Sequence, residues 1–184
     1  MVDAGVPAHA AAMDHQSARG LFGMETEPVI EKLALKWRTV RLEIDQDEKA
    51  LADCRAQKPC PEAARELLNI IVEAGGRTGR PRVGLINRAV NLAITPTTDE
   101  AQSGVRDHWS SPLETLQSHR GDCEDYAIVK YVALREMGMS SEDVKILILH
   151  NRFPDEYHAV AAVRVSGEWS ILDNRRLTLV RMPT

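Results

Sequence analysis

The chain of 184 residues is 43% hydrophobic and 27% charged, which is typical of one globular domain with an ordinary hydrophobic core. Its 23 basic and 27 acidic residues give a formal net charge of −4, and this charge argues against a broad nucleic-acid-binding surface. No apolar run approaches the roughly 20 residues that a membrane-spanning helix needs. We therefore expect neither a nucleic-acid partner nor a membrane span.

The predicted elements start after a lead segment. Residues 1–26 have no hydrophobic periodicity and no apolar signal-peptide core, so we interpret them as a flexible lead before a single domain over residues 27–184. We expect the sequence to be either a mature form or a shortened chain that lacks an export signal. From Pro28 to about Cys54, apolar residues recur every three or four positions, which predicts a long amphipathic helix; a break near "DQDE" stays open.

Two cysteines close the next segment. Cys54 and Cys60 lie six positions apart with Pro59 between them, a spacing that suits a disulfide around a small loop. Such a bridge would stabilise the fold by roughly 2 kcal/mol in the chain-entropy account and would indicate an oxidising compartment such as a periplasm. Two free thiols are the alternative. A zinc site is disfavoured because no second Cys or His pair lies nearby at the required spacing.

The remaining pattern predicts helices followed by strands. A second helix begins at Pro61, a third covers "RVGLINRAVNLAI", and a fourth covers "DCEDYAIVKYVALREMGM" and stops at Gly138. Strands are expected at "VKILILH", "YHAVAAVRV" and "EWSILD", with a hairpin turn at Ser166–Gly167. The segment "RLTLVR" is expected to supply a final strand. Helices before an antiparallel sheet make an α+β fold.

The stretch "HRGDCEDYA" places Cys123 among three carboxylates, those of Asp122, Glu124 and Asp125. Negative neighbours raise the pKa of a thiol and suppress the thiolate. Asp122 is a favoured N-cap type, however, so Cys123 falls in the first turn of its helix. The helix dipole and free N–H groups there favour a thiolate and could stabilise an oxyanion. A nucleophilic Cys123 would still need a base.

The hairpin register supplies a candidate base. With the turn at "SG", Val160 faces Asp173, and His158 lies diagonal to Asp173 on the same face of the sheet. A carboxylate there could hold the imidazole in the tautomer that deprotonates Cys123. A register slip by one residue would put Asn174 in place of Asp173, and either type can serve. Spacing alone leaves a second interpretation open, a core cysteine and a structural histidine.

Three segments in this order resemble the bacterial transglutaminase-like cysteine proteinases: "DHWSSPLETLQSHRGDCEDYAIVKYVALREMGM", "YHAVAAV" and "ILDN". The resemblance covers about residues 80–175 and extends to the LapG-like periplasmic proteases within that family. It implies a papain-like/transglutaminase-like fold with the cysteine at a helix N-terminus. It also implies that Cys123 is the nucleophile, His158 the general base and Asp173 its orienting partner.

The same resemblance offers a reason for the acidic neighbours. LapG-like proteases bind calcium beside the catalytic cysteine, and Asp122 and Glu124 match those ligands, with Asp125 as a further candidate. Ca²⁺ prefers oxygen ligands, and its charge would offset the field that opposes the thiolate. The alternative is that Asp122 caps the helix while the other two carboxylates favour its positive end.

The resemblance also sets the expected function. We expect a thiol hydrolase that cuts peptide bonds through an acyl-enzyme, acting in the periplasm or outside the cell on a protein or peptide, with a surface adhesin among the candidates. A regulatory protein partner is a further expectation. The Cys54–Cys60 pair looks like a feature of a shorter subgroup, not of the adhesin-cutting members. Two alternatives remain, transglutaminase-type acyl transfer to an amine and a non-catalytic calcium-responsive binding module.

Overall fold

The computed structural model describes residues 27–97, 108–152 and 155–182. The chain divides into two compact units, residues 1–35 and residues 36–184, and helix α2 (Glu27–Arg55) runs across the division. Every candidate site residue lies in the second unit. No helix among the described residues is long and apolar enough to cross a membrane.

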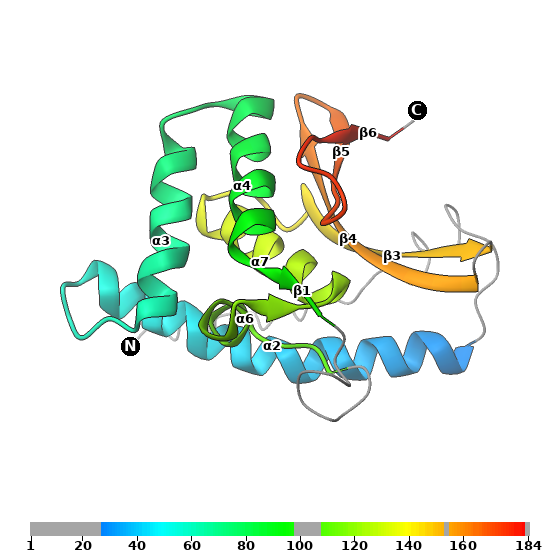
Figure 1. The fold of residues 1–184 in the computed structure, drawn as a ribbon, viewed down its shortest axis with the longest axis horizontal. Helices are drawn as coiled ribbons and strands as arrows, with labels where there is room; N and C mark the ends of the chain where they lie inside the picture. The colour runs from blue at the N-terminus through cyan, green and yellow to red at the C-terminus, as the bar shows by residue number, and fades with distance from the viewer. Residues whose placement is uncertain (1–26, 98–107, 153–154, 183–184) are drawn as a thin grey trace, which may run out of the picture. The chain divides into compact units, whose positions relative to one another are not determined.

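The second unit is built from helices followed by an antiparallel sheet (Figure 1), which confirms the predicted α+β class. The helices after α2 are α3 (Glu62–Gly75), α4 (Gly79–Ala93), α6 (Pro112–Ser118) and α7 (Cys123–Glu136). The four-stranded sheet has the order β3 (Val144–Arg152), β4 (Asp155–Val165), β5 (Glu168–Leu172) and β6 (Val180–Arg181). Two short strands, β1 (Thr95–Pro96) and β2 (Arg120–Gly121), form a separate parallel pair.

Most of the predicted elements are present, with four differences. Helix α2 continues through "DQDE" without a break, and the final strand has only two residues. Helix α6 and the β1–β2 pair were not predicted. A local signal for α6 does exist, since Ser111 is its N-cap, accepts a hydrogen bond from the Glu114 N–H at 3.4 Å, and is followed by Pro112.

Helix α7 is the centre of the fold. It packs against β3 and β4 on one side and against α3, α4 and α6 on the other (Figure 1). A helix covered on all sides is expected to be apolar all round, and most of α7 is buried accordingly, including Ile128, Val132 and Leu134. The position of Cys123 at the start of α7 therefore places the thiol where the central helix meets the sheet.

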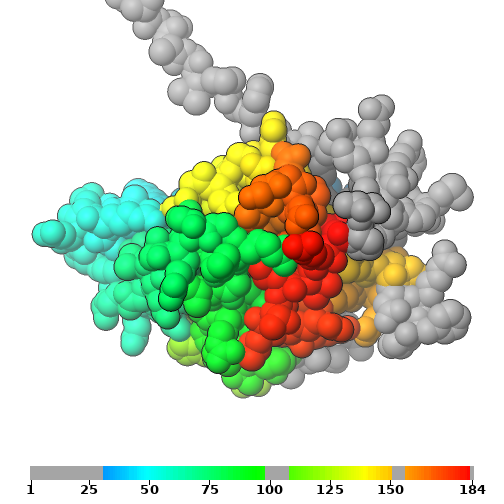
Figure 2. Space-filling view, turned by 90° about the horizontal axis from the view of Figure 1, so that it is seen from above, coloured from blue at the N-terminus to red at the C-terminus, as the bar shows by residue number. Residues whose placement is uncertain are grey.

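The segment after β5 is held on α4. The side-chain amide of Asn87 donates to the Arg176 carbonyl at 2.8 Å, and that of Asn91 donates to the carbonyls of Asp173 and Arg176 at 2.9 Å each. Figure 2 shows this C-terminal segment (red) lying directly beside α4 (green). These contacts fix the backbone on which Asp173 is carried.

The predicted disulfide is present. Cys54 near the end of α2 is bonded to Cys60 just before α3. The bridge closes the turn between the two helices, and Cys123 is a free cysteine.

Candidate active site

The start of α7 is shaped by a capping box. Asp122 is the N-cap, and its backbone N–H donates to Asp125 Oδ2 at 3.2 Å. Gly121 lies so close to this arrangement that a Cβ there would come within 2.8 Å of Asp125 Cβ and Oδ2. Only glycine fits, and this packing sets how the chain enters the helix at Cys123.

Asp125 is committed to this structural role. Its side chain is fully buried, and its second oxygen, Oδ1, accepts a hydrogen bond from the Ser110 N–H at 2.9 Å. Both carboxylate oxygens therefore accept hydrogen bonds from backbone N–H groups, one just before α6 and one at the N-cap of α7. Among the described residues the compact cluster of possible metal ligands contains Asp122, Cys123 and Glu124, and Asp125 is outside it.

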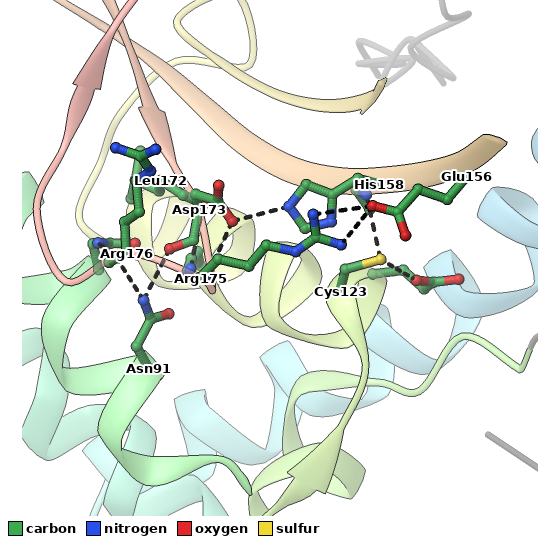
Figure 3. Close-up of polar contacts among 12 residues, drawn as sticks. Asn91, Cys123, Glu156, His158, Leu172, Asp173, Arg175 and Arg176 are labelled. Atoms are coloured by element: carbon green, nitrogen blue, oxygen red, sulfur yellow. Dashed lines mark hydrogen bonds and ion pairs between the residues drawn. The ribbon is translucent and has the colours of Figure 1, made fainter. Parts of the chain in front are cut away.

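His158 and Asp173 meet as the hairpin register predicts. The observed register pairs Val165 with Glu168 and Ala162 with Ile171, and Ser166 and Gly167 at the turn both have positive φ. Strand β5 ends at Leu172, so Asp173 follows directly. Its Oδ1 lies 2.9 Å from His158 Nε2, as Figure 3 shows.

Two further contacts hold this pair. The backbone N–H of Arg175 donates to Asp173 Oδ1 at 2.9 Å, and the Arg175 guanidinium bonds Glu156 Oε1 at 3.1 and 3.2 Å. Glu156 is two residues before His158 on β4. Arg175 thus ties the segment that carries Asp173 to the strand that carries His158.

The sulfur of Cys123 lies against the same strand. Its Sγ accepts a hydrogen bond from the backbone N–H of Ala159, the residue after His158, at 3.3 Å, and Figure 3 shows the sulfur on the side of the imidazole. The other ring nitrogen of His158, Nδ1, is buried and has no hydrogen-bond partner among the described residues. The ring therefore uses Nε2 for Asp173 and leaves Nδ1 available for the thiol.

The surroundings of Cys123 favour the neutral thiol. Burial raises the pKa of Cys123 most, and the charge of Glu124 raises it further, whereas the Ala159 N–H lowers it. The thiol donates to Glu124 Oε2 at 2.9 Å, and the Trp109 indole holds Glu124 Oε1 at 3.2 Å. The concern that the neighbouring carboxylates suppress the thiolate is thus supported by this geometry.

The surroundings of Asp173 act in the opposite sense. Burial alone would raise its pKa, but the hydrogen bonds from His158 and the Arg175 N–H, together with the charges of His158 and Lys130, lower the pKa to about 2. Asp173 is therefore a carboxylate at any physiological pH. An anion at Nε2 favours the tautomer that carries its proton there.

Two contributors to the site were missed from the sequence. Lys130 is fully buried. It lies seven positions after Cys123 in a run that is otherwise largely apolar, and this run was an available signal for its burial. The bond between the Trp109 indole and Glu124 had no local signal in the sequence. That bond joins residues 15 positions apart, so it depends on tertiary packing.

Comparison with known proteins identifies the family of the chain. A cysteine at the N-terminus of a helix that packs on an antiparallel sheet, with a histidine on that sheet, defines the papain-like and transglutaminase-like class of folds. The family model described as "bacterial transglutaminase-like cysteine proteinase BTLCP" matches residues 54–182. The chain belongs to this family and is a cysteine protease.

Solved structures give the same fold. The chain is similar to Legionella pneumophila LapG, with 24% sequence identity and a TM-score of 0.57 over 73% of this chain and 76% of that one. Calcium-bound LapG of the same organism matches with 22% identity and a TM-score of 0.56 over 75% and 76% of the two chains. A third LapG structure is of EGTA-treated protein. No curated protein sequence matches the chain.

Proposed function

We propose that this protease uses Cys123, His158 and Asp173 as a catalytic triad to hydrolyse peptide bonds through an acyl-enzyme. The proposal rests on two contacts, one made by the His158 ring and one made by the backbone of the residue after it. Nε2 lies 2.9 Å from Asp173 Oδ1, while the Cys123 sulfur is bound at 3.3 Å by the N–H of the next residue, Ala159. His158 Nδ1 has no hydrogen-bond partner among the residues that the structure describes, so it is available to accept the proton of the thiol.

The chemistry follows from that arrangement. His158 Nδ1 accepts the proton of Cys123 as Sγ attacks the carbonyl carbon of the scissile bond. Free N–H groups in the first turn of α7 stabilise the oxyanion that forms. The imidazolium then gives its proton to the leaving amine, and a thioester remains on Cys123. Water, deprotonated by the same ring nitrogen, releases the acid product and restores the thiol.

A thiol-reactive probe tests the triad. The rate of Cys123 labelling by iodoacetamide is expected to exceed that of a free cysteine in unfolded protein, and to fall to or below it in His158→Ala. Labelling of the native protein no faster than that of the unfolded chain would favour the non-catalytic binding module. With a peptide library, products that carry a new carboxylate support hydrolysis, and products joined to an added primary amine support the acyl-transfer alternative.

Calcium binding is part of the proposal, with Asp122 and Glu124 as the ligands. Their ligand atoms lie within 4.8 Å of each other and of the Cys123 sulfur, and carboxylate oxygens are the donors that Ca²⁺ prefers. LapG has been solved in a calcium-bound form. We leave Asp125 out because both of its oxygens are engaged by backbone N–H groups. A bound cation would supply positive charge beside a thiol whose pKa is raised by Glu124.

Calorimetric titration with calcium, and with magnesium as the control, tests this part. Binding of calcium is expected, with weak substitution by magnesium because that ion prefers a tight octahedral shell. Calcium is also expected to raise the melting temperature, since a ligand that binds only the native state stabilises it. An absence of heat at millimolar calcium would leave Asp122 as a helix cap only.

We further propose that the protein works in the periplasm or outside the cell on a protein or peptide substrate. The Cys54–Cys60 disulfide supports an oxidising compartment. A surface adhesin is a candidate substrate and a regulatory protein a candidate partner, in line with the family. Fractionation of the source cells, with recovery of the protein in the cytoplasm, would contradict the location. The family match lies inside the predicted domain of residues 27–184, whose boundaries stay a prediction.

A further inference from the structure

Helix α7 contains a lysine where an apolar residue would be expected. Lys130 has no exposed surface, and its neighbours on the helix, Val129 and Tyr131, are core or half-buried residues. Burial of an ammonium group is costly unless the charge is compensated. Burial lowers the pKa of Lys130 to about 7, against the opposing effect of Asp173. A methionine would fill the same space without that cost, so the charge itself calls for an explanation.

The contacts of the ammonium group point toward the triad. Lys130 Nζ donates to the carbonyl of Leu172 at 3.3 Å, and Leu172 is the residue directly before Asp173. The ammonium also lies 5.7 Å from the centre of the Tyr126 ring, whose hydroxyl is anchored by a 2.6 Å bond to the Ile94 carbonyl. Lys130 is therefore held in place from its own helix and reaches the end of β5.

The backbone at Asp173 is gripped from two sides. Lys130 holds the carbonyl that precedes Asp173, and the Asn91 amide holds the carbonyl of Asp173 itself at 2.9 Å. Leu172, Asp173 and Asn91 are labelled in Figure 3, where the Asp173 carboxylate projects toward His158. Asn91 is neutral, so of these two groups only Lys130 adds a positive charge behind the carboxylate.

We propose that Lys130 is a positioning residue of the triad: its buried ammonium holds the Leu172 carbonyl and faces Asp173, and so keeps that carboxylate against His158 Nε2. The imidazole is thereby kept in the tautomer that leaves Nδ1 unprotonated for Cys123. This inference rests on the proposed triad and assigns to Lys130 a role that acts only through Asp173. A purely structural lysine would affect unfolding and leave the imidazole unchanged.

The test compares Lys130→Met with Asp173→Asn, the double variant and Lys145→Met. Lys145 lies exposed on β3 and is the matched control for loss of a lysine charge. Iodoacetamide labelling of Cys123 is expected to slow by about tenfold in Lys130→Met and by twofold or less in Lys145→Met. The double variant is expected to be no slower than Asp173→Asn alone, because both changes interrupt the same contact.

A spectroscopic measurement separates positioning from stability. The ¹⁵N resonances of the His158 ring are expected to show Nε2 protonated in the native protein and a mixture of tautomers in Lys130→Met. Lys130→Met leaves the Leu172 carbonyl and the Asp173 carboxylate without this partner, so it is expected to unfold at a lower denaturant concentration. The ring resonances are therefore compared under conditions in which circular dichroism shows both proteins to be folded. A normal labelling rate together with native His158 resonances in this variant would overturn the proposal.

Two controls keep the outcomes distinct. If labelling of the unmodified protein does not depend on His158, the triad itself fails; if it does, and Lys130→Met has no effect, only the positioning role fails. Should Lys130→Met not fold, the Lys130 ammonium resonance is compared between the unmodified protein and Asp173→Asn. A shift of that resonance supports the proposal that the Lys130 ammonium faces the Asp173 carboxylate, and an unchanged resonance overturns it.

Discussion

The two sides of the candidate site differ in how their charges are balanced. On the thiol side, Cys123 lies between Asp122 and Glu124, and burial and the Glu124 charge raise the pKa of the thiol. On the imidazole side, Asp173 is hydrogen-bonded by His158 and the Arg175 N–H and faces Lys130, and the net effect lowers the pKa of Asp173 to about 2. The chain balances the charge of the second side and leaves the first with excess negative charge.

This difference shows which side of the site still lacks a partner of opposite charge. The imidazole side is complete because its carboxylate already has partners contributed by α7, β4 and the segment after β5. The thiol side is incomplete because the Trp109 indole and the thiol itself are hydrogen-bond donors to Glu124 without a full positive charge. An external cation would complete it, and the proposed calcium ion has that role. A substitution on one side is therefore expected to leave the contacts of the other side intact.

The largest effects are expected from the two residues at which the sides meet. Cys123→Ala should abolish covalent labelling and proteolysis, and His158→Ala should slow both by about 10²- to 10⁴-fold, the usual contribution of a general base. Labelling kinetics, with circular dichroism to confirm the fold, are the measurement. Turnover retained in His158→Ala would show that the thiol does not depend on the imidazole.

A smaller but clear effect is expected on the imidazole side. Asp173→Asn should slow labelling by roughly tenfold or more, since an orienting group is lost while the base remains. It should also change how the free energy of unfolding depends on pH in the acid range. The pKa of Asp173 is lowered in the folded protein to about 2, from its ordinary value of 3.8, so its stabilisation is present above pH 3.8 and lost as the pH falls toward 2.

The size of that stabilisation is roughly 2 kcal/mol, from the difference between the two pKa values. Urea unfolding between pH 2 and pH 6 measures it. The unmodified protein should lose stability more steeply than Asp173→Asn across this range. Parallel curves for the two proteins would show that Asp173 has no special partner in the native state.

The thiol side should respond in the opposite direction. Glu124→Gln removes the charge that raises the pKa of Cys123 but keeps an acceptor for the Trp109 indole. In a chelator, labelling at neutral pH should therefore become several-fold faster than in the unmodified protein. Added calcium should accelerate the unmodified protein and have little effect on Glu124→Gln.

Glu142→Gln is the matched control, since Glu142 is an exposed carboxylate in the turn before β3. It should leave the labelling rate and its calcium response unchanged. Slower labelling of Glu124→Gln in chelator would mean that Glu124 assists the thiol, contrary to the charge imbalance described above.

The smallest effect on the reaction is expected from the disulfide. Replacement of Cys54 and Cys60 by serine should lower the free energy of unfolding by about 2 kcal/mol, the loop-closure value for so short a bridge. The labelling rate of Cys123 should stay the same because the bridge belongs to neither side of the site. Chemical denaturation and probe kinetics on the same samples check both statements. A large loss of labelling would connect the α2–α3 turn to the thiol.

Much of the fold and the proposed triad was predictable because the signals are local. The turn at Ser166–Gly167 fixes the hairpin register, and that register brings Asp173 to His158. Asp122 marks where α7 begins and thus where Cys123 lies in the helix. Short spacing around a proline was enough to propose the Cys54–Cys60 bridge. Periodicity, capping and turn chemistry depend on neighbours within a few residues, and a sequence displays them directly.

The roles of the other charged residues were decided by tertiary structure. Glu124 and Asp125 are adjacent and chemically alike, yet Glu124 lies beside the thiol, and Asp125 is buried under Gly121 with both oxygens on backbone N–H groups. Lys130 could have been a solvated helix residue. It is buried because α7 is packed on all sides, and the end of β5 gives its ammonium group a hydrogen-bond acceptor. Partners of this kind come from segments distant in sequence, so their identity depends on how the helices and the sheet pack.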